Sequence, residues 1–192
     1  MAKRTTETVH RLKVTLLEVE PPVWRRLDVP SQIKISALAG VLEAAVGWYG
    51  GHLHGFAVGA LAYGIPDPDF GSRTIIDERR VRLGEVLPAV TDTMRWDYDF
   101  GDGWEHEVLV EAIEPPDPGV AYPVCRAGMR ACPPEDCGGP WGYDDFLVAL
   151  VDPAHERHEE LRDWVPPGFD PEAFDIERAT QWMRSAAPAQ SW

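Results

Sequence analysis

The alternation of apolar and polar residues predicts a β-hairpin followed by a helix at the start of the chain. Residues 9–19 and 23–29 are rich in apolar and β-branched side chains, which is typical of strands, and two adjacent prolines separate them. Residues 37–47 then carry apolar side chains at helical spacing and predict an amphipathic helix. Residues 52–58 alternate again and predict a further strand.

A second hairpin is predicted where two alternating segments, residues 94–100 and 104–113, flank the sequence GDG. A two-residue turn would mix apolar and charged side chains on both faces of this hairpin. A loop of residues 101–103 instead pairs Phe100 with Trp104 and separates an apolar face from a charged face. Because register follows the buried face, and such loops commonly hold glycine in the left-handed conformation, we expect the three-residue loop.

This register predicts an acidic ladder on one face of the hairpin. Asp99 lies opposite Glu105, and Asp97 lies opposite Glu107. Like charges in opposed positions destabilise a sheet by a few tenths to about 1 kcal/mol per pair. We therefore expect arginines to cross this face, or a cation or a basic protein partner to bind to it.

The remaining chain is expected to combine irregular structure with helices. Residues 114–141 are rich in proline and glycine and predict a long ordered loop or arm. Together the elements predict an α+β fold with a mixed, mainly antiparallel sheet of about five strands, one helix after the first hairpin, and a C-terminal helical segment of two to three helices. We expect residues 9–184 to form a single domain, with a flexible N-terminus at residues 1–8 and a flexible tail at residues 185–192.

The charge of the chain limits the class of partner. Its 32 acidic and 18 basic residues give a net charge of −14. Phosphate backbones repel such a surface, so direct DNA binding is disfavoured, whereas a basic protein or a cation fits. The N-terminus lacks the apolar stretch of a signal peptide, and no segment approaches the roughly 20 apolar residues of a membrane span, which predicts a cytoplasmic protein with reduced cysteines.

Two histidines are candidate metal ligands. His52 and His54 are two residues apart on a predicted strand, so they should point the same way and could share zinc or another divalent metal. His106 could join them if the two strands are neighbours. The alternative is that these imidazoles are half-buried and hydrogen-bonded without a metal.

The three cysteines form a second candidate metal set. Six residues separate Cys125 from Cys132, and four separate Cys132 from Cys137. Structural zinc sites favour two to four residues between paired cysteines, so the first gap is too wide for a typical zinc knuckle. The alternative is that the thiols are small buried groups that hold an irregular loop in place.

Five segments occur in order along the chain and together resemble one family. They are PPVWRRLDVP, GWYGGHLHGF, DERRVRLGEVL, YDFGDGWEHEV and YPVCRAGMRACPPEDCGGPWGYDDFL. They resemble the plasmid pRiA4b ORF-3-like family over about residues 9–184. The resemblance implies a small α+β protein, a family-typical hairpin and an association with mobile elements, because some members are described as insertion-element passengers or TnpR-like resolvases. It supplies no catalytic residues, and in similar proteins the position matching Cys137 can hold another residue, which argues against an obligatory three-cysteine zinc site.

Recombination is not expected of this chain itself. A serine recombinase needs an activated serine among arginines and a basic DNA-binding helix, and none of the five serines lies in such a setting. A tyrosine recombinase needs an Arg-His-Arg set ahead of its nucleophile, which this sequence lacks. The net charge of −14 also opposes DNA binding.

Three functions follow from these patterns. The first is a non-catalytic binding or accessory protein that contacts a protein partner through an acidic and aromatic surface. That surface would consist of Asp97, Asp99, Glu105, Glu107, Trp104 and Trp141. The second is a metal-dependent hydrolase that uses the strand carrying His52 and His54. The third is an acidic mimic of nucleic acid that binds a DNA-binding protein.

Overall fold

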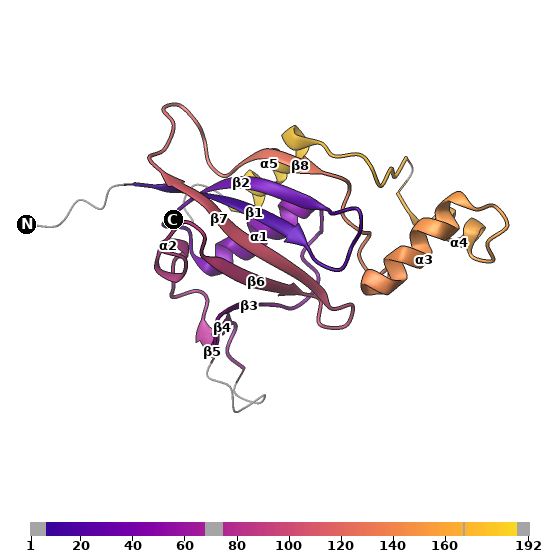
Figure 1. Cartoon of the computed structure of the whole chain (residues 1–192), viewed down its shortest axis with the longest axis horizontal. Coiled ribbons are helices and arrows are strands. Elements are labelled where there is room, and N and C mark those ends of the chain that lie inside the picture. Colours follow the sequence, from indigo (N-terminus) through magenta and orange to yellow (C-terminus); the bar gives the residue numbers. More distant parts are fainter. Residues whose placement is uncertain (1–6, 68–74, 167, 188–192) are drawn as a thin grey trace, which may run out of the picture.

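The computed structural model describes residues 7–67, 75–166 and 168–187 (Figure 1). Its strands are β1 (Val9–Leu16), β2 (Trp24–Pro30), β3 (His54–Val58), β4 (Leu61–Gly64), β5 (Ile75–Asp77), β6 (Thr93–Tyr98), β7 (Trp104–Glu114) and β8 (Val124–Met129). Its helices are α1 (Ile35–Val46), α2 (Leu83–Val86), α3 (Gly139–Val151), α4 (His158–Trp164) and α5 (Ile176–Ala186). The strands form one sheet in the order β5-β4-β3-β6-β7-β1-β2-β8.

The α+β class and the mixed, mainly antiparallel sheet are confirmed. Strands β4 and β5 pair in parallel, whereas the neighbours from β4 through to β8 pair in antiparallel fashion. Helix α1 follows the first hairpin as predicted, and α3, α4 and α5 make up the C-terminal helical segment.

The predicted number of about five strands is wrong, because the sheet has eight. Strands β4 and β5 are too short to show an alternating pattern, and each is held mainly by its neighbour. Strand β8 lies inside the proline- and glycine-rich segment that we expected to be an irregular loop. It forms because it pairs with the exposed edge of β2, a tertiary contact that local composition does not reveal.

Alternation places one face of the sheet against the helices. The strand side chains on this face include Leu12, Val14, Leu27, Trp96, Tyr98, Trp104 and Val108, and all are at most 1% exposed. The apolar stripe of α1, including Leu38, Val41 and Leu42, covers them and is also buried. At ~25 cal/mol per Å² of apolar surface, this packing is the main stabilising contribution to the fold.

The opposite face of the sheet carries opposed charges in pairs. Arg26 of β2 donates to Glu111 of β7, and Arg11 of β1 donates to Asp28 of β2 at 2.9 Å. Arg126 of β8 reaches the same Asp28 at 2.7 Å. These acidic side chains therefore form ion pairs with arginines, which offset their negative charge.

The longer helices and α4 occupy two separate places (Figure 1). Helices α1 and α5 lie together against one side of the sheet, whereas α3 and α4 extend from its end, next to the β6–β7 loop. The beginning of α3 contacts that loop, because the Gly138 backbone N donates to the Asp102 carboxylate at 3.1 Å. Residues 185–186, which we expected in the tail, complete α5, while residues 1–6 and 188–192 lie outside the described part of the chain.

Gly139 is expected to be essential for this contact. It has a φ of +72°, and a Cβ there would lie 2.3 Å from the Asp102 carbonyl oxygen. We expect Gly139→Ala to lower the free energy of unfolding by roughly 1–3 kcal/mol, as for other non-glycine residues in a strained conformation. Urea unfolding followed by tryptophan fluorescence measures this change.

Gly51→Ala is the matched control. A Cβ at Gly51 meets no described atom within 4 Å, and its φ lies outside the left-handed region. Its effect should stay within about 0.5 kcal/mol. Equal effects of the two substitutions would contradict the assigned contact.

Candidate metal centre

The β6–β7 hairpin differs from the predicted register by two residues. Tyr98 pairs with Trp104 and Asp97 pairs with Glu105, so residues 99–103 form the loop. The predicted three-residue loop is wrong because the chain turns earlier, at Asp99, which has a φ of +52°. The Asp99 carboxylate accepts the backbone N–H of Gly101 at 2.9 Å, an arrangement typical of an aspartate in a turn.

This shift shortens the predicted acidic ladder to Asp97, Glu105 and Glu107. Asp99 leaves the strand, and Arg95 faces Glu107 across the hairpin. Arg95 Nε lies 2.9 Å from Asp97, and Arg95 Nη1 lies 3.7 Å from Glu105. The pKa of Asp97 is raised overall, because burial and the charge of Glu105 together outweigh the opposite effect of the nearby Arg95. An arginine of the same hairpin therefore offsets the repulsion between the two carboxylates.

The two predicted contact tryptophans have different environments. Trp104 is 1% exposed and packs against Trp48, so its assignment to a contact surface is wrong. Trp141, near the beginning of α3, is 86% exposed and stays available. Phe100, in the hairpin loop, is 62% exposed. The sequence did not single out Phe100, because the predicted register placed it inside the sheet.

His106 lies in the hydrophobic core and cannot join the other histidines. Its ring stacks on Trp96 with a centroid distance of 4.3 Å. Its Nδ1 is 3.3 Å from the Trp96 carbonyl oxygen, and burial lowers the pKa of His106 to about 3. The ring is neutral at physiological pH and serves the core.

His52 and His54 point to different groups, so the prediction that they share one metal is wrong. His54 begins β3, whereas His52 precedes the strand, and the alternation expected of strand residues does not apply to it. His54 Nε2 lies 3.1 Å from Glu78 and its Nδ1 lies 3.6 Å from Glu43. Although burial opposes it, the hydrogen bond and charge of Glu78, with the charge of Glu43, raise the pKa of His54.

His52 instead meets two aspartates from distant segments. Its Nδ1 lies 3.2 Å from Asp99 in the hairpin loop, and its Nε2 lies 3.5 Å from Asp136 in the segment before α3. One ligand atom from each residue lies within 4.8 Å of the other two, the one such group of three among the described residues. We call these three residues the His52 cluster. Asp136 was missed because nothing local links the acidic pair in PPEDCGG to a histidine far away in the sequence.

Neighbouring contacts fix the segment that supplies Asp136. The Tyr98 hydroxyl donates to Glu135 at 2.6 Å, and the Tyr49 backbone N donates to the same carboxylate at 3.2 Å. Burial and the adjacent Glu135 raise the pKa of Tyr98 so far that the hydroxyl remains a donor. The β6 strand and the residues before β3 therefore hold Asp136 close to His52.

The cysteines do not form a comparable group. Among the described residues, no thiol belongs to a group of three potential metal ligands. Burial raises the pKa of Cys125 to about 11 and those of Cys132 and Cys137 to about 12. The buried thiols are therefore neutral in the absence of a metal, and their burial is typical of small groups that pack within a loop.

The His52 cluster has the chemistry of a divalent-cation site. One imidazole and two carboxylates suit manganese or zinc, and water molecules could occupy the remaining coordination positions of either metal. The Asp99 side chain is 13% exposed, that of His52 29% and that of Asp136 74%, so such a site would open to solvent.

The fold and this cluster define a two-layer α+β protein with a candidate cation site at the end of its sheet. The chain belongs to the plasmid pRiA4b ORF-3-like protein family, whose model matches residues 8–178. It is 48% identical to the uncharacterised protein y4hQ of Sinorhizobium fredii, over 93% of this chain and 96% of that protein.

A solved structure supports the same fold. The crystal structure of MM3350, a protein of unknown function from Methanosarcina mazei Go1, matches with a TM-score of 0.82 and 34% sequence identity. The match covers 90% of this chain and 98% of that one. None of the helices in the described ranges has the length and apolar composition needed to cross a bilayer.

The raised pKa of His54 predicts a pH dependence of stability. A group whose pKa is higher in the folded state than in the unfolded state stabilises the protein. This contribution is complete below the unfolded-state pKa, which is 6.5 for His54, and it is lost as the pH rises through the pKa of the folded state. Replacing His54 by glutamine removes that contribution. We expect His54→Gln to flatten the decrease in the free energy of unfolding above pH 6.5, measured by urea unfolding between pH 6 and 9.

His155→Gln provides the control, because His155 also lies near a carboxylate, 3.4 Å from Asp145, but outside the group formed by His54, Glu43 and Glu78. This variant should keep most of the native slope. An unchanged slope in His54→Gln would refute the ion-pair assignment.

Proposed function

We propose that this protein is a non-catalytic binding protein that holds a divalent cation in the His52 cluster and contacts a protein partner there. The observation that carries the proposal is the convergence of three ligand side chains from three separate segments within 4.8 Å. Two of them, Asp99 and Asp136, have φ values of +52° and +61°, so each projects from a tight turn.

The exposure of the cluster favours binding over enclosed chemistry. The side chain of Asp136 is 74% exposed, so a bound cation would keep positions open to water or to a partner's oxygen ligands. Phe100 directly follows Asp99 and is 62% exposed, and Trp141 is 86% exposed five residues after Asp136. Exposed aromatic side chains beside charged groups are typical of protein interfaces. The net charge of −14 favours a partner with a basic surface.

A metal-dependent hydrolase is the second candidate. Open coordination positions would let a bound cation activate water, which is how metal hydrolases generate a nucleophile. This alternative uses His52 with Asp99 and Asp136, not the His52 and His54 pair expected from the sequence. Mimicry of nucleic acid has less support, because arginines accompany the acids on the open face of the sheet.

Metal titration of the purified protein tests the proposal. We expect Mn²⁺ or Zn²⁺ to bind with one equivalent per chain in isothermal titration calorimetry. Asp136→Asn should weaken that binding at least tenfold, because an amide is a poorer ligand than a carboxylate and Asp136 is too exposed to be needed for folding.

Asp145→Asn is the matched control, since Asp145 also lies beside a histidine, His155, but outside the cluster. It should bind the metal as the native chain does. Absence of saturable binding, or equal loss in both variants, would reject the cation site. Turnover of bis(p-nitrophenyl) phosphate by the metal-loaded protein, abolished by Asp136→Asn, would favour the hydrolase instead.

A further inference from the structure

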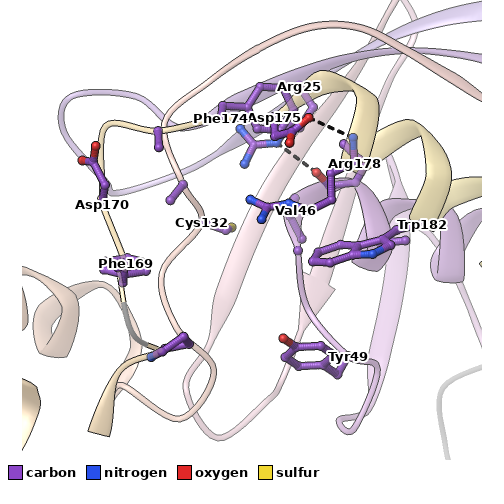
Figure 2. A pocket seen from close by; sticks show the side chains of 18 residues that line it. Arg25, Val46, Tyr49, Cys132, Phe169, Asp170, Phe174, Asp175, Arg178 and Trp182 are labelled. Atoms are coloured by element: carbon purple, nitrogen blue, oxygen red, sulfur yellow. Dashed lines mark hydrogen bonds between the residues drawn. The ribbon is translucent and has the colours of Figure 1, made fainter. Parts of the chain in front are cut away.

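A pocket separate from the His52 cluster lies between the end of α1, the beginning of α5 and the segment that precedes α5. Its volume is about 280 Å³, close to the lower limit of typical small-molecule sites. In Figure 2, Arg25 and Phe174 lie at one end of this pocket, and Phe169 faces Trp182 and Tyr49 across it. The lining thus combines aromatic surface with a small number of charged groups.

Arg25 brings a buried positive charge to the pocket. The residue is 1% exposed, and its guanidinium donates to the carbonyl oxygens of Ala45, Trp24 and Met129, each at 2.9 Å. The ring of Phe174 covers it at 3.9 Å. These acceptors are neutral, and no described carboxylate forms an ion pair with Arg25, although buried charges are normally paired.

Arg178 adds a second positive charge at the mouth of the pocket. Its guanidinium lies 5.4 Å from the Trp182 ring centre, and it too has no ion pair with a described carboxylate. The nearby Asp175 keeps its negative charge, and its Oδ1 caps α5 by accepting the Arg178 backbone N–H at 2.9 Å. Asp170 likewise uses Oδ1 to accept the Glu172 backbone N–H at 2.9 Å.

Two carboxylates, Asp170 and Asp175, also line the pocket, but among the described residues neither forms an ion pair with Arg25 or Arg178. Cys132 lies close to Arg25, but burial raises the pKa of its thiol to about 12, so it carries no negative charge. Tyr49 and Trp182 pack with ring centres 6.5 Å apart and form an aromatic wall. In a chain with a net charge of −14, two arginines without carboxylate partners in one aromatic pocket are unexpected.

We propose that this pocket binds a small organic anion, in which a carboxylate or phosphate group is attached to a compact aromatic or apolar body. Arg178 would contact the anionic group directly, since a guanidinium matches the geometry of both oxyanions. The buried charge of Arg25 would attract the same anionic group without contacting it. The rings of Tyr49, Trp182 and Phe169 would contact the apolar part of the ligand. This site uses side chains different from those of the His52 cluster and does not depend on a bound metal.

Three probes separate charge from apolar packing. Phenylacetate and phenyl phosphate carry the two candidate anionic groups on one ring, and phenylacetamide is the neutral equivalent. We expect saturable binding of at least one anion in ligand-observed NMR titrations of the full chain, at least tenfold tighter than binding of phenylacetamide. The preferred anion distinguishes a carboxylate site from a phosphate site.

Arg178→Gln tests the contact without changing the buried Arg25. It should weaken anion binding at least tenfold, whereas Mn²⁺ binding at the His52 cluster stays unchanged. Arg184→Gln removes the same charge from the same helix outside the pocket, where Arg184 donates to the Pro123 carbonyl oxygen at 3.2 Å, and it should bind the anion as the native chain does.

Three results would overturn the proposal. These are the absence of saturable binding of both anions, equal affinity for phenylacetamide, and equal affinity of Arg178→Gln and the native chain. Failure of Mn²⁺ binding alone would reject the cation site and leave the anion pocket standing.

Discussion

The buried guanidinium of Arg25 is the polar interaction that ties the helix layer of this protein to its sheet. It belongs to β2, yet it donates to Ala45 in the last turn of α1 and to Met129 at the end of β8. Removing a charge from water costs several kcal/mol, and here the carbonyl groups at a helix C-terminus, which carry partial negative charge, offset that cost. The guanidinium of Arg25 therefore joins the helix layer to the sheet and holds the edge strand β8, which composition alone does not favour. It also forms one end of the proposed anion pocket.

A cluster of aromatic rings packs on β6 and β7 in the middle of the sheet. Trp48, which follows α1, stacks on Tyr98 at 4.6 Å and contacts Trp96 and Trp104. Burying these large rings sets the register of the β6–β7 hairpin, since aromatic side chains contribute most to the energy of a core. Once Tyr98 is placed opposite Trp104, the chain must turn at Asp99, and that turn brings the Asp99 carboxylate to His52.

The two candidate sites share a single connecting segment. Cys132 lines the anion pocket, and four residues later Asp136 belongs to the His52 cluster. Trp48 Nε1 donates to the Pro133 carbonyl oxygen at 2.9 Å, and Tyr98 donates to Glu135, so the core holds this segment from two sides. Ligands at the two sites would therefore act on the same short stretch of backbone, which continues into α3 and the exposed Trp141.

The sequence by itself determined the class of fold, the first hairpin and its helix, and which side chains of β6 and β7 face the core. A shift of two residues leaves these faces unchanged, because strand side chains alternate with a period of two, so the pattern could not distinguish the predicted register from the observed one. Only the tertiary structure decided that His52 and His54 belong to different groups and that Asp136 lies beside His52. It also decided that Arg25 points into the core. These outcomes depend on contacts between segments far apart in the chain, whereas hydrophobic periodicity reports only the local environment of each segment.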